Sequence, residues 1–444
     1  MKWPVVLLAC AACGDNTAAP QVRDGFLRDA DGRALILRGV NLSGSQKVSP
    51  YIDDKTQADY TRVRADWGFN AIRFVMTWSA VEPTQGQYDD AYLAQVKTRM
   101  QWAAAANLAV VIDMHEDIYG EGFGFDGAPK WTCDPSHYDA FVPRDQWFLN
   151  AADPNVQACT DALYSDNAAA FTAAWVHVAQ ALAGEPAIVG FDVLNEPNWG
   201  TYSIYQFERD RLEPFYEQVV PAVRAVAPRW VAFLEPGASR NLGFATSLQP
   251  FPFGDVMYAA HNYDITAEQG GGSGFDDANR AGVIANVASL QLEATTLGAG
   301  LWIGEYGGDG SSPTIGDYMT ADYDAAGAVA AGTMLWAYDK SDGYGLLDPE
   351  GNEKPALVGA VVRPYPEAVA GQPLSYAFDA TTSTFTLTYV PEDLGVPTVI
   401  SVPARVYPSG FTVECGCTVT EQPGEVLLSG ASAFGKPATV TIHP

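Results

Sequence analysis

Three glutamates, Glu196, Glu235 and Glu305, each follow a short apolar run, where a buried strand would end. A buried carboxylate rarely lacks a partner or a chemical role. Two facing carboxylates suit glycoside hydrolysis, in which one protonates the leaving oxygen and the other attacks the anomeric carbon or activates water. The acid then needs a raised pKa, which burial and an ionised neighbour would supply. Spacing alone does not select two of the three. Glu196 could instead cap the next helix or pair with an arginine, and Glu235 could be a structural acid.

Glu196 has the clearest local setting, in the stretch 188–197. Its first seven residues, Ile-Val-Gly-Phe-Asp-Val-Leu, are mostly apolar and predict a strand buried on both faces, as in a parallel sheet covered by helices. Asn195 and Glu196 follow, and Pro197 ends the strand because proline cannot donate a ladder hydrogen bond. The chain therefore places a carboxamide and a carboxylate at the carboxyl end of a buried strand.

Similar strand-like runs alternate with alanine-rich helical patterns as far as residue 338. The strand-like runs are Leu35–Asn41, Ala71–Trp78, Ala109–His115, Ile188–Glu196, Trp230–Glu235, Val256–Tyr263, Leu301–Tyr306 and Thr333–Tyr338. The helical patterns include Asp89–Ala106, Asn167–Leu182, Ile204–Ala227 and Asp276–Leu297. Eight strands alternating with helices predict an eight-fold β/α (TIM) barrel over residues 20–364, with a doubly wound open sheet as the alternative.

In a β/α barrel, functional side chains lie where the strands end. A single polar strand end would be ordinary, but almost every predicted strand here ends in a polar or aromatic side chain. This pattern predicts a site rather than a set of core residues that satisfy one another. The side chains are Asn41, Lys47 just beyond it, Arg73, Trp78, His115, Asp117, Asn195, Glu196, Glu235, His261, Tyr263, Glu305, Tyr306, Trp336 and Tyr338.

Two regions depart from this alternation. Over residues 365–444, helical patterns give way to short β-branched runs separated by turn residues, which predict an antiparallel β-sandwich domain. That domain either packs on the barrel or binds carbohydrate separately. The segment Tyr119–Asp166 is rich in Gly, Pro, Asp and aromatic residues, and it leaves the third strand on the side of the predicted site. Long structured loops of this kind are usually functional or cross-linked.

Composition limits the classes of partner. The chain has 444 residues, of which 48% are hydrophobic and 18% charged, enough for one large core and a smaller domain. Its formal net charge of −28 repels phosphate backbones and anionic lipid, which argues against a nucleic-acid partner and fits a neutral or cationic substrate. The acidity could equally serve only to keep an exported protein soluble. We expect a monomer.

Residues 1–19 predict an export signal and a linker. Lys2 precedes a short apolar run and small residues, as in secretory signals. Leu7-Leu-Ala-Cys10 resembles a bacterial lipoprotein signal, in which the cysteine is lipidated and anchors the protein to a membrane. Cys13 is a second candidate, and a soluble secreted protein is the alternative. In either case the chain would be exported from a bacterial cell.

The other four cysteines would then lie in a compartment that permits disulfides. Cys133 and Cys159 flank one insertion and could bridge it. Cys415 and Cys417 lack the Cys-x-x-Cys spacing of zinc and redox sites. They are too close for a relaxed bridge, so they would be reduced or form a strained pair.

The sequence predicts no cofactor and no catalytic metal. The stretch 122–127 fits the dinucleotide pattern Gly-x-Gly-x-x-Gly, but no helix follows it, and Glu121 and Asp126 would repel a pyrophosphate. The five histidines include no His-Glu-x-x-His pair. The carboxylates could still hold calcium.

The motifs around two of the glutamates resemble those of glycoside hydrolase family five. Leu-Asn-Glu196-Pro is similar to that family's acid/base motif, and Trp-Ile-Gly-Glu305-Tyr-Gly-Gly to its nucleophile motif. More narrowly, the stretches 113–119, 125–131, 363–366 and 402–408 resemble endoglycoceramidases. Further strand-end residues match the family pattern, namely Arg73, His115, His261, Tyr263 and Trp336.

The resemblance implies a retaining endo-β-glycosidase that cuts the β-glucosyl bond between the glycan and the ceramide of glycosphingolipids. It implies that Glu196 is the acid/base and Glu305 the nucleophile. It also implies the roles of the substrate-binding residues. Tyr263 would position Glu305, and Arg73 would hold the charge of this nucleophile. Asn195 would bind the 2-hydroxyl of the sugar, and Trp336 would form the floor on which the sugar stacks. Other sugar hydroxyls would be contacted by His115, Asp117 and Lys47, with His261 among them.

Some residues depart from the family pattern. Glu116 stands where the family commonly has glutamine, and Phe125 where a second glycine usually precedes Asp-Gly-Ala-Pro. Phe123, Phe125 and Trp131 could form an apolar lip for a lipid or pack within their loop. The class of reaction is therefore better indicated than the substrate. The alternatives are an endo-β-1,4-glucanase or other β-glucosidase of the same family, and a non-catalytic glycan-binding surface lipoprotein.

Overall fold

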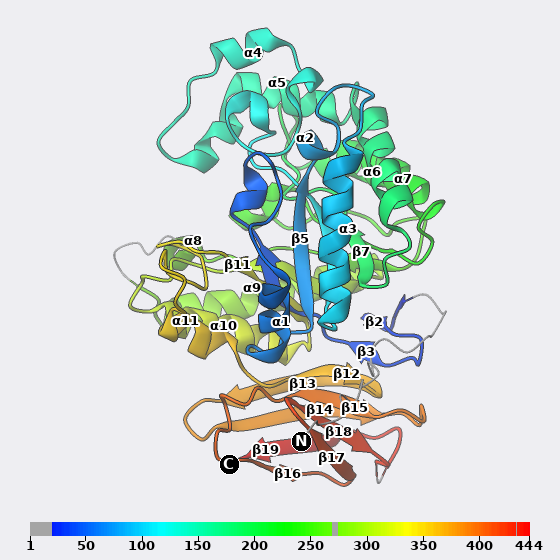
Figure 1. Ribbon diagram of the computed structural model, residues 1–444, viewed down its shortest axis with the longest axis vertical. Coiled ribbons are helices and arrows are strands. Elements are labelled where there is room, and N and C mark those ends of the chain that lie inside the picture. The colour runs from blue at the N-terminus through cyan, green and yellow to red at the C-terminus, as the bar shows by residue number, and fades with distance from the viewer. Residues whose placement is uncertain (1–19, 269–273, 432) are drawn as a thin grey trace, which may run out of the picture.

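The computed structural model describes residues 20–268, 274–431 and 433–444. Eight parallel strands close into a barrel in the order β10-β11-β4-β5-β6-β7-β8-β9 (Figure 1). The predicted β/α barrel is therefore confirmed, and the open-sheet alternative is wrong. The strands are β4 Arg38–Leu42, β5 Ala71–Thr77, β6 Ala109–His115, β7 Ile188–Asp192, β8 Val231–Leu234, β9 Val256–Tyr258, β10 Gly300–Tyr306 and β11 Gly332–Tyr338.

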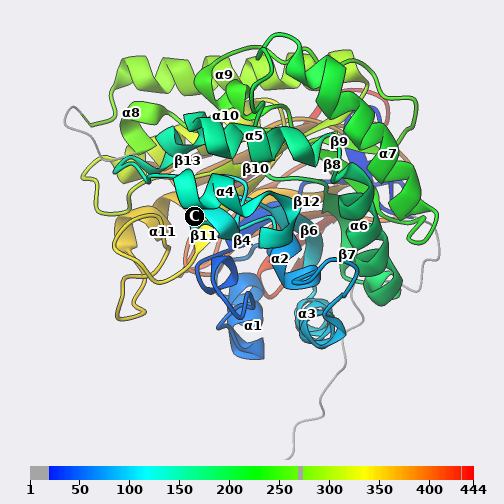
Figure 2. The ribbon, with the colours of Figure 1, turned by 90° about the horizontal axis from the view of Figure 1, so that it is seen from above.

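Helices surround this barrel (Figure 2). In α3, Asp89 caps the first turn by accepting the N–H of Tyr92 at 2.8 Å, and the buried side chains recur at helical spacing. The helices around the barrel are α1 Gln57–Ala65, α2 Trp78–Val81, α3 Asp90–Ala105, α6 Ala168–Leu182, α7 Glu213–Arg224, α8 Ile265–Glu268, α9 Asp277–Leu297, α10 Ile315–Ala328 and α11 Pro355–Val361.

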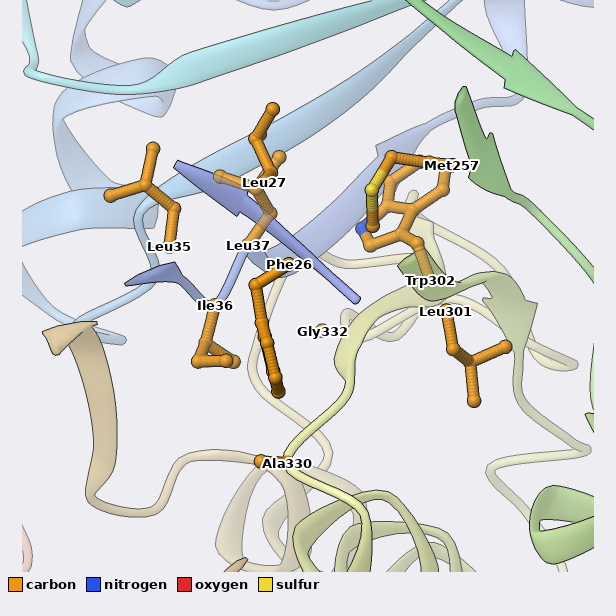
Figure 3. A pocket seen from close by; sticks show the side chains of 10 residues that line it. All are labelled: Phe26, Leu27, Leu35, Ile36, Leu37, Met257, Leu301, Trp302, Ala330 and Gly332. Atoms are coloured by element: carbon orange, nitrogen blue, oxygen red, sulfur yellow. The ribbon is translucent and has the colours of Figure 1, made fainter. Parts of the chain in front are cut away.

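The amino-terminal end of the barrel is closed by an apolar plug. The strands β2 (Phe26–Arg28) and β3 (Ala34–Leu35) cross it, and Leu27 packs with Met257 and Trp302 (Figure 3). The cavity left there has a volume of about 10 Å³, which is at most about enough for one water. This end is therefore sealed core, and a substrate site must lie at the opposite end.

The C-terminal domain consists of two antiparallel sheets, as predicted, and lies below the barrel in Figure 1. With β1 at Gln21–Arg23, one sheet has the order β1-β2-β3-β12-β15-β18-β17 and the other β13-β14-β19-β16. Its strands are β12 Tyr365–Val369, β13 Gly371–Asp379, β14 Thr384–Pro391, β15 Thr398–Ser401, β16 Thr412–Glu414, β17 Thr418–Gln422, β18 Glu425–Ser429 and β19 Ala438–His443.

The amino-terminal strands differ from the sequence-based division at residue 364. β1 (Gln21–Arg23), β2 and β3 belong to the first sheet of the C-terminal domain rather than to the barrel. The link is antiparallel pairing of β3 with β12, in which Ala34 lies opposite Val369. Pairing between such distant segments leaves no local signal in the sequence.

The long segment after β6 carries α4 (Pro135–Ala140) and α5 (Pro154–Leu163), which lie at the top of Figure 1, remote from the C-terminal domain. A disulfide joins Cys133 to Cys159 and so ties the start of this segment to α5. Cys415 and Cys417 are also joined to each other. None of the described helices is long and apolar enough to cross a membrane. Cys10 and Cys13 lie outside the described residues.

Ion pairs connect the barrel to the C-terminal domain. Arg64 of α1 pairs with Glu367 of β12 at 2.8 Å and also with Glu425 of β18. Glu353, before α11, accepts hydrogen bonds from Trp67 at 2.9 Å and from Arg62 and Arg405 at 3.1 and 2.9 Å. Its side chain is 25% exposed. These contacts, led by the hydrogen bonds from Arg405, lower the pKa of Glu353 to about 2.

Glu353→Gln should reduce stability in a pH-dependent way. The folded pKa lies below the ordinary value of 4.5, so the ionised side chain stabilises the fold above about pH 5 and loses this effect as the pH falls toward 2. After allowance for solvent screening, we expect a loss of about 1 kcal/mol at pH 7 that shrinks by pH 3. Urea unfolding at both pH values measures it, with the exposed Glu350→Gln as control. Equal midpoints for wild type and variant at pH 7 would contradict the argument.

Candidate active site

Polar and aromatic side chains at or just beyond the strand ends gather at the carboxyl end of the barrel, where the guanidinium of Arg73 on β5 is buried. The strand ends bring together most of the predicted residues, as a β/α barrel requires. Three strand-end aromatics point elsewhere: Trp78 donates to Glu82, Tyr338 donates to Asp59, and Tyr306 is buried in the core. The sequence rule therefore selects the right end of the barrel but includes side chains that serve packing.

Arg73 is the centre of the polar network. Its Nη1 donates to Glu305 Oε1 at 2.6 Å, and its Nη2 donates to Glu235 Oε1 and to Asn195 Oδ1 at 3.0 Å each. Its Nε donates to Asp192 at 2.9 Å, and Asp113 lies 3.0 Å from Nη2. One cation thus orients the floor of the site. The predicted strand-end residue Asn41 accepts from Nη1 at 3.2 Å, and Asp192 joins the network without having been identified as functional from the sequence.

Glu305 is held at both carboxylate oxygens. Arg73 binds Oε1, and the Tyr263 hydroxyl donates to Oε2 at 2.9 Å. Burial raises the pKa of Glu305, and this effect outweighs the lowering by His261 and Arg73. Two fixed donors keep the carboxylate in one orientation, which a nucleophile requires.

Glu235 and Glu196 have different tasks. Glu235 is buried and accepts hydrogen bonds from Arg73 and from the backbone N–H of Glu196, the latter at 2.9 Å. It thereby fixes the backbone of Glu196, whose φ of 40° is unusual for a residue other than glycine. Glu235 is therefore a structural acid, and Glu196 and Glu305 remain as the pair that faces the site.

The side chain of Glu196 is oriented by two donors on one oxygen. Asn241 Nδ2 lies 2.7 Å and His261 Nδ1 2.8 Å from Glu196 Oε1. The hydrogen bonds among the described residues thus use Oε1 and leave the other oxygen, Oε2, available. Asn241 was not identified from the sequence, because it lies in the loop beyond β8 rather than at the strand end.

The pKa of Glu196 differs from the raised value expected of an acid. Burial raises it, but the hydrogen bond and charge of His261, together with Lys47 and Arg73, lower it below its ordinary value. Burial lowers the pKa of His261, but Glu235 and Glu305 more than reverse this and raise it well above its ordinary value. In the free protein the proton of the Glu196–His261 pair therefore resides on the imidazole, 2.8 Å from the carboxylate.

A second cluster lies beside this pair. His115 stacks on Trp336 with ring centroids 5.3 Å apart, and Lys47 Nζ lies 4.4 Å from the Trp336 ring centroid. Lys47 also binds Asp117, and His115 Nδ1 pairs with Asp113 at 2.6 Å. Burial and the charges of Lys47 and Arg73 hold the pKa of His115 well below its usual range, so this imidazole is neutral at pH 7. An ammonium, a carboxylate, an imidazole and an indole are groups that bind a sugar.

Within the part of the chain that the structure describes, two sets of side chains have ligand atoms close enough for a metal: His115, Asp117 and Asp126, and Glu196, His261 and Glu305. Each set already contacts or contains a cationic side chain of the protein. Lys47 pairs with Asp117, and the charged His261 pairs with Glu196. A metal at either place would have to compete with these side chains.

The three aromatic residues that the sequence suggested for an apolar lip, Phe123, Phe125 and Trp131, differ in how deeply they are buried. Phe123 is buried and packs edge-on against Tyr138 and Phe141, with ring centroids 4.9 and 5.2 Å away. It therefore belongs to the loop's own packing. Trp131 is partly buried against Trp78, and Phe125 is also only partly buried.

The comparisons with known proteins agree with this geometry. Residues 28–342 match the cellulase (glycosyl hydrolase family 5) model, and residues 363–442 match the glycoside hydrolase family 5 C-terminal domain. The chain belongs to glycosyl hydrolase family 5. It is therefore a glycoside hydrolase, and its similarity to endoglycoceramidases covers both domains.

Among the relatives is endoglycoceramidase I of Rhodococcus hoagii, which is 27% identical over 94% of this chain and 86% of that protein. Endo-glycoceramidase II from Rhodococcus sp. has been solved as a lactosyl-enzyme intermediate, with 29% identity, a TM-score of 0.84 and coverage of 95% of this chain and 99% of that one. Its ganglioside GM3 complex has 28% identity and a TM-score of 0.84, and covers 94% and 99% of the two chains.

Replacing Asn241 tests the orientation of Glu196. Asn241→Ala removes one of the two donors to Oε1, so the carboxyl should be less well aimed at a leaving oxygen. We expect kcat/KM to fall about tenfold for an alkyl β-glycoside, whose departure needs a proton, and much less for a dinitrophenyl β-glycoside.

The neighbouring Leu242→Ala, on an exposed side chain, is the matched control. An equal loss on both glycosides would indicate a general structural defect instead of misplacement of the acid.

Proposed function

We propose that the protein is a retaining endo-β-glycosidase that hydrolyses the β-glucosyl bond between the glycan and the ceramide of glycosphingolipids. The observation that carries the mechanism is that one oxygen of Glu196, one of Glu305 and a ring nitrogen of His261 lie within 4.8 Å of one another. Retaining enzymes place their carboxyl groups about 5–5.5 Å apart, and inverting enzymes about 6.5–9.5 Å. The lactosyl-enzyme intermediate of the Rhodococcus relative supports the same chemistry.

In the first step, Glu305 attacks the anomeric carbon as the bond from that carbon to the ceramide oxygen breaks. Glu196 gives that oxygen a proton, which the Glu196–His261 pair holds, and ceramide leaves as an alcohol. In the second step, Glu196 takes a proton from water, the water oxygen bonds to the anomeric carbon, and the Glu305 ester bond breaks. The glycan leaves with its anomeric configuration retained.

The surrounding residues bind the sugar and stabilise charge. Arg73 and Tyr263 hold Glu305 before attack and after release. Asn195, whose Nδ2 donates to the backbone of Glu116 at 3.1 Å, would bind the 2-hydroxyl. The second cluster, with Lys47, His115, Asp117 and Trp336, would hold the sugar in the glycan half of the site.

The choice of substrate rests on the relatives. The endoglycoceramidases resemble this chain across both domains, and the Rhodococcus enzyme has been solved with ganglioside GM3. The matching family model is also described as cellulase, so an endo-β-1,4-glucanase is the second candidate. The intact pair of Glu196 and Glu305 argues against a purely glycan-binding protein, which would need neither role.

A substrate panel separates these candidates. We expect release of intact glycan from lactosylceramide and a ganglioside in detergent, with glucosylceramide and carboxymethyl-cellulose as comparison substrates. Proton NMR of the first product should show retained β configuration. Hydrolysis of cellulose alone would exclude the glycolipid substrate, and an inverted product would exclude double displacement.

Glu305→Gln tests the nucleophile. The amide cannot form the glycosyl ester, so turnover should fall by at least about 10⁴-fold while the thermal unfolding midpoint stays close to that of the wild type. The structural acid offers a contrast: Glu235→Gln should lower stability as well as activity, since Glu235 fixes the backbone of Glu196. Normal turnover in Glu305→Gln would end this mechanism.

We also propose that the protein is exported as a monomer and anchored through Cys10. The support is the sequence Leu7-Leu-Ala-Cys10, with Cys13 as the second candidate. Metabolic labelling with a radioactive fatty acid should be lost in Cys10→Ser and kept in Cys13→Ser. Loss only in Cys13→Ser would move the anchor, and no labelling of the wild type would favour a soluble secreted protein.

A further inference from the structure

The segment 142–149 exposes an unusual amount of apolar surface. The side chains of Val142, Trp147, Phe148 and Leu149 are 72%, 49%, 37% and 39% exposed. We call these four residues the apolar tip. It comprises Val142, in the connection after α4, and the start of the short helix η4 (Trp147–Ala152), in the part of the molecule at the top of Figure 1. Isolated exposed apolar residues are ordinary, but a cluster marks a surface that contacts something.

The loop that carries the apolar tip is held in a defined shape. Asn150 is buried, its Oδ1 accepts the N–H of Arg144 at 2.8 Å, and its Nδ2 donates to the carbonyl of Trp147 at 2.7 Å. A buried amide that bonds to backbone at both ends of the loop keeps the four apolar side chains outside. Their exposure is therefore built into the fold.

The apolar tip belongs to the same segment after β6 as Asp117 of the second cluster. Phe141, next to Val142, packs on the buried Phe123, which follows Asp117 in the same loop. The Cys133–Cys159 disulfide fixes the base of the whole segment. Five of the nine other large apolar side chains that the described residues expose lie on segments that follow barrel strands, namely Val48, Tyr205, Leu242, Phe244 and Ile265. Such segments begin at the carboxyl end of the barrel, which also holds the site.

We propose that the apolar tip inserts into the lipid–water interface of a micelle or bilayer and so seats the mouth of the site on the surface that holds the substrate. This inference rests on the proposed function, because the bond to ceramide lies at such an interface. Tryptophan beside aliphatic side chains is the composition of interfacial anchors. The surface it fits is uncharged or zwitterionic, since the tip loop itself carries one cation and one anion, Arg144 and Asp145, and the chain's formal charge of −28 repels anionic lipid.

Vesicle flotation tests this surface with the full chain. Every protein carries Cys10→Ser and Cys13→Ser, so that no N-terminal lipid contributes. The protein with these two substitutions alone is called the wild type in this experiment. The tip variant combines Trp147→Ser, Phe148→Ser and Leu149→Ser. The matched control combines Leu292→Ser, Leu374→Ser and Phe434→Ser, which are as exposed but lie on α9 and the C-terminal domain.

Wild type and control should float with phosphatidylcholine vesicles, and the partition coefficient of the tip variant should fall about tenfold or more. Its rate on lactosylceramide in vesicles should fall in parallel, while hydrolysis of a soluble aryl β-lactoside stays within about twofold of wild type. Circular dichroism checks that both variants fold.

Three results would overturn the proposal: a wild type that does not float, a tip variant that floats equally well, or a control that loses as much as the tip variant. Light scattering tests the other possible partner of the apolar tip, a second copy of the chain. A wild-type dimer that the tip variant dissociates, with flotation unchanged, would make the apolar tip a contact between copies. If the wild type hydrolyses no lactoside, the proposed function fails, but flotation still tests the surface.

Discussion

One guanidinium facing four buried carboxylates is the constraint on which the site depends. Arg73 lies against Asp113, Asp192, Glu235 and Glu305, all of them buried. Burial raises the pKa of Asp113 and of Asp192 well above the usual range, and Arg73 only partly opposes this effect. Removing the cation would leave these buried carboxyl groups without their shared partner, and breaking a single buried ion pair already costs about 3–5 kcal/mol. The strand ends can meet because Arg73 is there, so it serves the fold and the chemistry together.

His261 supplies the second positive charge, and the reaction changes what holds it. Glu235 and Glu305 are the main neighbours that raise the pKa of His261. In the mechanism we propose, the charge of Glu305 would disappear when it becomes a glycosyl ester, and the imidazole would lose one reason to keep its proton. The Glu196–His261 pair would by then have given a proton to the leaving oxygen, which would leave Glu196 ionised as the base for the second step. The low pKa of Glu196 in the free protein is thus compatible with an acid/base that shares its proton with a neighbour.

The barrel and most of the site could be predicted because both follow from local patterns. Strand-like runs alternate with helices, and a parallel barrel must bring strand ends together, so Glu196 and Glu305 meet although their sequence positions are distant. Three features needed tertiary structure. Asn241 lies beyond a strand end, the contact of His261 reverses the pKa expected for Glu196, and the pairing of β3 with β12 joins opposite ends of the chain.

Glu116 shows how a sequence departure can leave the chemistry of a site unchanged. It stands where the family commonly has an uncharged glutamine, and it lies next to Asp117. Its Oε2 accepts the N–H of Tyr119 at 2.7 Å, which favours ionisation, but burial and the nearby carboxylates of Asp117, Glu196 and Glu235 dominate and raise its pKa to about 8. At neutral pH the side chain is therefore mostly an uncharged carboxylic acid, close to an amide in size and polarity. The site already has more carboxylates than cations, and it tolerates one more glutamate because that glutamate stays protonated.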